Sequence, residues 1–331
     1  MNYSKAQAKD WARQNMVGQW TTMMTPFTSE DEIDFEGLKK NIEHVLKLGT
    51  KGMGFSWNMG EFWSLTHEER LKLIEAVPGL VKQRARIAFQ ITGTCLKEVI
   101  SYGKKIEAAG FDLAILAAPY MMTKTESQVL DWVERVAEKL NIGIAFYNSP
   151  QFGITLSAKA LTKMTEIKNL AAIKEASFNA QISLDTHLAA GKNAVISVPD
   201  EEIFFYEPYY GFHQQVMFAN TSDWRFDTEE RHDYVEFINL MTKGEFDKGK
   251  TLYSKIVPIK QLSRKWWGRM AAQTGGSLPV QMIKYWSELM GMAGGQVRPP
   301  VIPLTENEKA ELKFDLEKLG VSKALSGSLA H

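Results

Sequence analysis

The sequence has almost no cysteine and no excess of either charge. Cys95 is the only cysteine in 331 residues, which excludes an internal disulfide and fits a reducing compartment. Lysine and arginine together number 39, as do aspartate and glutamate, and the basic residues form no stripe along the chain. A nucleic-acid partner is therefore not expected.

Features of membrane proteins and of several cofactor sites are absent as well. No apolar run approaches the length of a membrane span, and residues 1–15 contain no apolar signal core. No G-x-G-x-x-G turn follows the first predicted strand, which weakens a dinucleotide-binding interpretation. The six histidines form no H-x-x-H or H-E-x-x-H pair, so we predict neither a metal nor another cofactor. These absences leave a cytoplasmic enzyme or binding protein.

Short apolar segments, by contrast, recur along most of the chain. We predict strands at 19–24, 52–57, 86–92, 113–118, 143–147, 194–198 and 215–219, and a further one in the stretch 171–177 with Lys174 near its end. Helical patterns separate most of them, and such an alternation indicates a parallel sheet that is buried on both faces. Eight βα units of this size suit a (β/α)₈ TIM barrel better than an open doubly wound sheet.

The chain divides into three predicted parts. Residues 1–17 are an N-terminal lead-in, 18–236 form the barrel, and 237–331 form a C-terminal helical region in which the strand pattern has stopped. Within the barrel, Asp34 and Thr66 are the expected N-caps of two helices. Pro78-Gly79 is expected to kink or end the second of these helices.

The lysine near the end of the sixth predicted strand is the first candidate catalytic residue. Lys174 lies in the apolar stretch 171–177, and lysine is almost never buried without a partner or a function. Burial disfavours the ammonium form, and a neutral amine can attack a carbonyl to form a Schiff base. A plainer interpretation is open, in which the ammonium group reaches solvent or pairs with Glu175.

Tyr147 occupies the matching position at the end of the fifth predicted strand. Neighbouring strands lie about 4.8 Å apart, so its hydroxyl could approach Lys174 or an adduct on it and transfer protons. Ala145 and Ala172 share the faces of Tyr147 and Lys174 and leave room beneath them. The alternative is an aromatic side chain that only fills space.

Several segments together resemble one enzyme family. They are Thr25-Pro26-Phe27, Gly60-Glu61 with Ser64-Leu65-Thr66, Tyr147-Asn148-Ser149-Pro150, Ile173-Lys174-Glu175-Ala176-Ser177, and Gly295 to Pro300. In order and spacing the set is similar to the dihydrodipicolinate synthase / N-acetylneuraminate lyase family of Schiff-base aldolases. The resemblance implies a TIM barrel with a C-terminal helical domain, a homo-oligomer (dimer or tetramer), and chemistry on pyruvate or a related 2-oxo acid. It also implies that Lys174 forms the imine and that Tyr147 relays protons.

The sequence departs from the family pattern at positions that bear on the substrate. Asn58 and Met59 stand where two small hydroxyl residues usually hold the substrate carboxylate, so that contact would fall to the Asn58 amide and to backbone N–H groups. Val198 is a further expected substrate contact through its backbone. Met121 stands at the position of a second relay tyrosine, and Gln151 begins a segment without the arginine that dihydrodipicolinate synthases use. A true dihydrodipicolinate synthase is therefore not expected.

The resulting functional hypothesis is a class I aldolase or lyase that cleaves or forms a C–C bond through a lysine imine. An apolar rim of Trp57, Met59, Met121, Met122 and Phe152 would suit a bulky or aromatic aldehyde partner. Two alternatives are a sugar-acid dehydratase or hydratase-aldolase that uses the same imine, and a non-catalytic protein that binds a 2-oxo acid.

Two polar segments near the predicted strand ends have no assigned role. Asp200-Glu201-Glu202 follows the seventh strand, and the turn 220–224 follows the eighth. For the acidic cluster, a helix N-terminus is the favoured interpretation over a substrate contact. The turn is a further possible part of the pocket wall.

Overall fold

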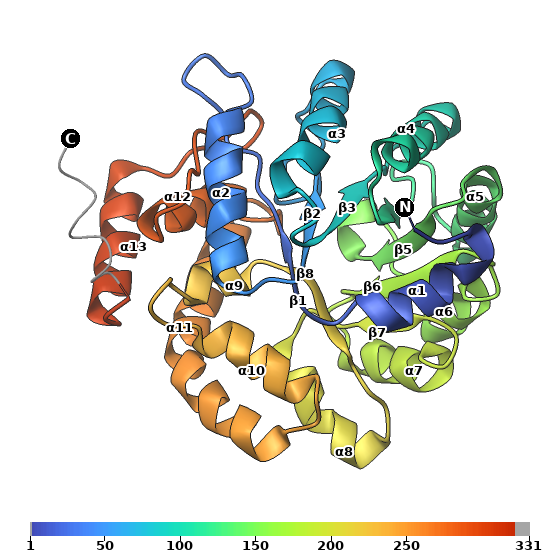
Figure 1. Ribbon diagram of the computed structural model, residues 1–331. Helices are drawn as coiled ribbons and strands as arrows, with labels where there is room; N and C mark the ends of the chain where they lie inside the picture. Colours follow the sequence, from blue (N-terminus) through green and yellow to red (C-terminus); the bar gives the residue numbers. More distant parts are fainter. Residues whose placement is uncertain (1, 322–331) are drawn as a thin grey trace.

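Eight parallel strands form the centre of the molecule. The computed structural model describes residues 2–321, and Figure 1 shows the strands enclosed by helices. The strands are β1 Gly18–Thr22, β2 Gly52–Phe55, β3 Arg86–Gln90, β4 Leu113–Ala117, β5 Gly143–Asn148, β6 Leu170–Glu175, β7 Val195–Ser197 and β8 Val216–Asn220. They pair in the order β7-β6-β5-β4-β3-β2-β1-β8. The backbone N–H of Phe218 donates to Ser197 Oγ (2.8 Å) and links β8 to β7, so the predicted (β/α)₈ barrel is confirmed.

The helices that follow the strands form the outer ring. They are α2 Phe35–Lys47, α3 His67–Val81, α4 Leu96–Ala109, α5 Glu126–Lys139, α6 Ala158–Met164, α7 Ala180–Ala190 and α8 Glu207–Tyr210, while α1 Ala8–Asn15 precedes β1. Asp34 and Thr66 cap α2 and α3 as predicted, since their side chains accept from the backbone N–H groups of Gly37 and Glu69.

Pro78-Gly79 was expected to kink or end its helix. The expectation that the helix ends there was wrong. Helix α3 continues through Pro78 and ends at Val81. Burial explains the continuation, because Val77 and Val81 pack in the core on either side of the proline. Their packing offsets the backbone hydrogen bond that proline cannot make.

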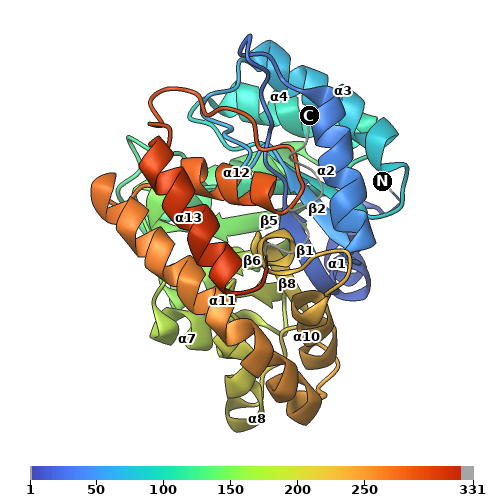
Figure 2. The same ribbon diagram turned by 90° about the vertical axis from the view of Figure 1, so that its left-hand side faces the viewer.

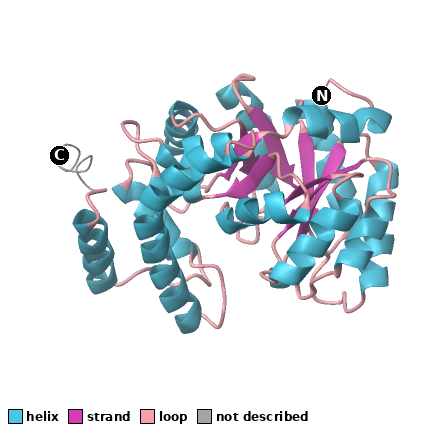
Figure 3. Ribbon diagram, turned by 90° about the horizontal axis from the view of Figure 1, so that it is seen from below, coloured by secondary structure: helices cyan, strands magenta, loops and turns pink. Residues whose placement is uncertain are grey.

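The C-terminal part of the chain is helical and stands against one side of the barrel. Its helices are α9 Ser222–Phe226, α10 Asp233–Met241, α11 Phe246–Gln273, α12 Val280–Leu289 and α13 Glu306–Lys318. Figure 2 shows α11, α12 and α13 together, and Figure 3 shows a group of helices to one side of the strands. The predicted boundary between 236 and 237 falls within α10 and stays a prediction, and residues 322–331 lie outside the described range. No helix of the described residues combines the length and apolarity that a membrane crossing requires.

A buried ion pair joins this helical region to the barrel. Lys284 of α12 places Nζ 2.6 Å from a carboxylate oxygen of Glu61, and the two side chains are 2% and 0% exposed. Glu61 lies in the segment after β2 that also carries Asn58 and Met59. The second Glu61 oxygen accepts from the backbone N–H of Arg298 (3.3 Å). The C-terminal region therefore fixes the segment that the sequence places at the substrate.

We expect Lys284→Met to destabilise the protein by about 3–5 kcal/mol, because it leaves the Glu61 carboxylate buried without a counter-charge. The double variant Glu61→Gln/Lys284→Met removes that charge and should recover part of the loss. Thermal and urea denaturation measure both effects. The control is Arg135→Met, which breaks an exposed pair with Asp131 and should cost less than about 1 kcal/mol. If Lys284→Met and Arg135→Met lost equal amounts of stability, burial would not explain the importance of the Lys284–Glu61 pair.

Candidate active site

One cavity opens at the carboxyl ends of the strands, where TIM-barrel enzymes carry their active sites. Its volume is about 150 Å³, comparable to a cavity that holds one benzene-sized molecule. Its lining comprises Thr22, Trp57, Asn58, Met59, Tyr147, Gln151, Lys174, Ala176, Phe178, Pro199, Ala219, Asn220, Thr221, Ser222, Arg225, Trp267 and Leu278. Two of these residues are cationic and none is acidic. The wall therefore favours an anionic occupant.

The amine of Lys174 is buried at this wall and only 7% of the residue is exposed. Its Nζ donates to the backbone carbonyl of Ala219. Burial lowers the Lys174 pKa from 10.5 to about 7. Pairing with Glu175 is excluded, because that carboxylate instead accepts from the backbone N–H of Ser177 (2.9 Å) and from the side chains of Asn148 and Ser183. About half of the Lys174 amines are consequently neutral near pH 7.

Two aromatic rings flank the same nitrogen. Lys174 Nζ lies 4.7 Å from the ring centroid of Trp57 and 4.7 Å from that of Tyr147. A Cβ at Gly54 would lie 2.6 Å from the Trp57 ring, so glycine is needed in β2 for the indole to reach this position. Ring faces attract cations, so a protonated amine or an iminium ion would be stabilised here.

Tyr147 lies on the strand next to Lys174, while the approach of its hydroxyl group to the amine stays a prediction. Strands β5 and β6 are neighbours, and their register places Tyr147 opposite Lys174. Burial raises the pKa of Tyr147 to about 12, so its phenol carries a proton at neutral pH. The pair therefore combines a partly neutral amine with a protonated hydroxyl group.

Of the three predicted substrate-binding residues, two line the cavity and one does not. Asn58 and Met59 line the cavity, and Asn58 Nδ2 donates to Gln151 Oε1. The Asn58 Oδ1 is buried without a protein donor. Val198 is not part of the lining, since the Gln214 side chain bonds its backbone N–H (2.7 Å) and its carbonyl (3.1 Å). Pro199 lies at the wall in its place.

The apolar rim differs from the predicted one. Met121 and Met122 are 73% and 83% exposed and do not line the cavity, and Phe152 packs behind Tyr147. That part of the prediction was wrong, because the segment after β4 turns outward at Met121, whose φ is 76°. The apolar rim consists of Trp57 and Met59, as predicted, with Phe178, Trp267 and Leu278.

Sequence reasoning missed Phe178, Trp267, Leu278 and Arg225. Trp267 and Leu278 belong to the C-terminal region, and no sequence pattern places that region over the cavity. A signal did exist for Arg225, since the predicted wall segment 220–224 ends one residue before it. Asn220, Thr221 and Ser222 of that turn do line the cavity.

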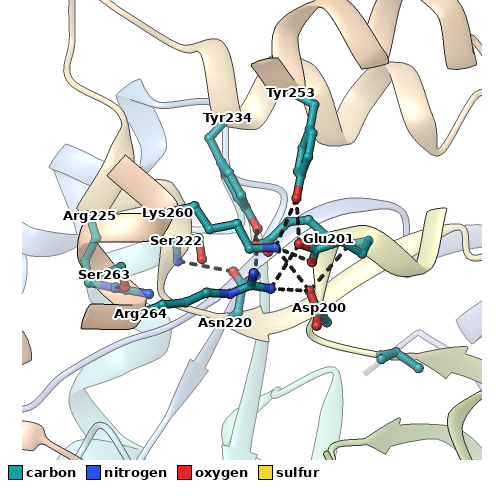
Figure 4. A network of polar contacts seen from close by, with 12 residues as sticks. Asp200, Glu201, Asn220, Ser222, Arg225, Tyr234, Tyr253, Lys260, Ser263 and Arg264 are labelled. Carbon is teal, nitrogen blue, oxygen red and sulfur yellow. Dashed lines mark hydrogen bonds and ion pairs between the residues drawn. The ribbon is translucent and has the colours of Figure 1, made fainter. Parts of the chain in front are cut away.

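The acidic cluster after β7 faces away from the cavity and pairs with α11. Asp200 is the N-cap of the 3₁₀ helix Glu201–Tyr206, as its helix-terminal interpretation requires. Lys260 Nζ lies 3.1 Å from Asp200 and 2.5 Å from Glu201, and Arg264 lies 2.9 Å from Glu202. Figure 4 shows Lys260 beside Asp200 and Glu201. The Lys260 ammonium group sits among the three carboxylates and takes the place that a metal ion would need.

Comparison with known proteins identifies the family. The pattern of the dihydrodipicolinate synthetase family matches residues 15–319. The chain belongs to this family. It is therefore a lyase of the class I aldolase type, which works through a Schiff base on a 2-oxo acid. The resemblance seen in the sequence is confirmed.

Individual relatives match over nearly the whole chain. The 4-hydroxy-tetrahydrodipicolinate synthase of Methanocaldococcus jannaschii is 28% identical over 92% of this chain and 99% of its own length. The enzyme of that name from Bacillus velezensis is 27% identical over 90% of this chain and 98% of its own. YagE from E. coli K12, solved in complex with pyruvate, has a TM-score of 0.78 at 21% identity, covering 92% of this chain and 99% of its own. That structure supports the fold alone.

The lowered pKa of Lys174 predicts an unusual pH dependence of its labelling. Only the neutral amine reacts with acetic anhydride, so the rate at Lys174 should rise about tenfold per pH unit below pH 7 and level off above it. Lysines of ordinary pKa should continue to react faster up to about pH 10. Peptide mass spectrometry after brief labelling compares them within one sample. A Lys174 rate that still rises between pH 8 and 10 would contradict the desolvated amine.

Proposed function

We propose that this enzyme joins or cleaves a C–C bond between pyruvate, or a related 2-oxo acid, and an aldehyde, with Lys174 as the imine-forming residue. The observation that carries the proposal is the buried Lys174 amine, which opposes Tyr147 at the wall of a cavity without carboxylates. A neutral amine in an anion-favouring cavity suits a carbonyl compound that carries a negative charge.

The contacts of Lys174 suit the first bond-forming step. The amine donates one N–H to the Ala219 carbonyl and keeps its lone pair for the ketone carbon. The new N–C bond gives a carbinolamine, whose hydroxyl group leaves as water once it gains a proton. The positively charged iminium ion then lies between the Trp57 and Tyr147 rings.

Tyr147 is the proposed proton relay of this sequence. Its phenol is protonated at neutral pH and can supply the proton that the departing hydroxyl group needs. Loss of a proton from the carbon next to the iminium gives an enamine, which attacks the aldehyde carbon. In the cleavage direction the same electrons return to the nitrogen as the aldehyde leaves. Water then releases the product from Lys174.

The rim supports an aldehyde with an apolar or aromatic body. Phe178, Trp267 and Leu278 line the cavity where the C-terminal region meets the barrel. Phe178 is 76% exposed and has a φ of 59°, an unfavourable conformation for a bulky residue. An exposed ring held in this way offers a surface for an apolar ligand. The homo-oligomer and the cytoplasmic location remain predictions.

Incubation with pyruvate and borohydride tests the imine. We expect the intact mass of the wild-type protein to increase by one reduced pyruvyl group, and Lys174→Ala to show no increase. The matched control is Lys9→Met, which removes a partly buried lysine outside the cavity and should keep the adduct. No adduct with pyruvate or with longer and aromatic 2-oxo acids would overturn the proposed mechanism.

Tyr147→Phe tests the relay separately. The ring and its contact with Lys174 remain, but the proton donor is lost, so turnover should fall by about 10²- to 10⁴-fold. The adduct should still form, more slowly, in the borohydride experiment. Stopped-flow formation of the imine and steady-state kcat provide the two readouts. Unchanged rates in both would exclude Tyr147 as the relay.

A further inference from the structure

Arg225 is the second cation of the cavity and its side chain has few protein partners. It lies on α9, just after β8, lines the cavity and is 5% exposed. Its Nε donates to Thr221 Oγ1 (2.9 Å) and its Nη1 donates to Ser263 Oγ of α11. Figure 4 shows Arg225 beside Ser263. Among the described residues, Nη2 has no acceptor.

The nearby acidic groups are committed to other partners. Glu201 pairs with Lys260 and accepts from the Tyr234 hydroxyl (2.9 Å). Asp223 accepts from the hydroxyl groups of Thr21 and Thr50, each at 2.8 Å. Within residues 2–321, no carboxylate forms an ion pair with Arg225. Glu201 and Asp223 lie near enough to favour the charged form of Arg225, but neither bonds it directly. A ligand anion that bonds the free Nη2 would add the direct partner that this buried guanidinium group lacks.

We propose that Arg225 binds an anionic group, a carboxylate or a phosphate, on the aldehyde partner. This inference rests on the proposed function, since it concerns the second substrate of that reaction. The planar guanidinium group suits both anions, because its N–H groups can bond two oxygens at once. The hydroxyl group of Thr221, which lines the same wall and accepts from Arg225 Nε, can serve as a further donor.

The position of Arg225 favours the aldehyde over the 2-oxo acid. Its partner Ser263 lies one turn before Trp267 on α11, so both side chains share a helix face. Trp267 belongs to the apolar rim that is assigned to the aldehyde. The resemblance places the carboxylate of the 2-oxo acid at the turn of Asn58 and Met59, which follows β2 instead. The aldehyde is therefore expected to combine an apolar body with a negative charge.

Pairs of aldehydes that differ only in charge test the inference. The probes are 4-carboxybenzaldehyde with benzaldehyde for the carboxylate, and glyceraldehyde 3-phosphate with glyceraldehyde for the phosphate. The readout is kcat/KM for the aldehyde in the presence of pyruvate. An aldehyde that is not turned over is compared through its inhibition constant in pyruvate trapping. We expect the wild type to prefer the charged member of one pair by about 10- to 100-fold.

Variants of Arg225 show whether the preference comes from this side chain. Arg225→Gln should abolish it, and Arg225→Lys should restore part of it because the charge returns without the planar fork. Arg70→Gln is the matched control. Arg70 is equally buried and donates to the Gln90 carbonyl, but it does not line the cavity, so its loss should lower stability and leave the preference unchanged.

Each contrary outcome has a distinct meaning. A wild type that prefers neither charged aldehyde overturns the anion site. A loss in Arg225→Gln that is equal for charged and neutral aldehydes makes Arg225 a structural residue. The pyruvate concentration for half-maximal trapping provides a further test. If it rises 10-fold or more in Arg225→Gln, by the same factor as the lost preference, Arg225 binds the 2-oxo acid and the inference is refuted. Failure of the wild type to trap any 2-oxo acid refutes the proposed function instead.

Discussion

The site depends on the burial of the Lys174 amine without a compensating carboxylate. An acidic neighbour would favour the ammonium form and remove the neutral amine that the proposed mechanism requires. The adjacent residue in the chain is acidic, yet strand alternation turns Glu175 to the other face of β6, where Asn148, Ser183 and the Ser177 backbone satisfy it. Alternation along the strand thus separates the Lys174 amine from the carboxylate of the next residue in the sequence.

Ion pairs outside the cavity hold the loops around it in place without adding a carboxylate to its wall. Lys284 holds the segment after β2 through Glu61, and Lys260 holds the segment after β7 through Asp200 and Glu201. Both lysines come from C-terminal helices, and the same region supplies Trp267 and Leu278 to the wall. The helical region therefore helps to form the cavity, since it fixes two loops and supplies part of the wall. The carboxylates of Glu61, Asp200 and Glu201 are thus paired with lysines outside the cavity and do not neutralise its positive charge.

The local pattern of apolar and polar residues was enough to predict most of the fold and the positions of Lys174 and Tyr147 on neighbouring strands. Buried parallel strands are short apolar runs, and one βα unit between Tyr147 and Lys174 places them on adjacent strands in register. The rim was not predictable in this way, because Phe178, Trp267 and Leu278 meet only through tertiary contacts. The prediction that Met121 lines the cavity failed for a related reason. Its apolar side chain suggested a wall, but a φ of 76° turns the segment outward, and local composition does not encode that turn.

The two cations of the cavity respond to the same environment in different ways. Burial lowers the pKa of Lys174 to about 7, so this group exchanges its proton under working conditions. Burial also lowers the pKa of Arg225, but only to about 10, and the guanidinium group therefore keeps its charge throughout the neutral range. One desolvated wall can thus provide a nucleophile and a permanent positive charge together. Exchanging the two residue types would place at position 174 a charged group that cannot attack a carbonyl, and at position 225 an ammonium group without the planar fork that bonds two oxygens at once.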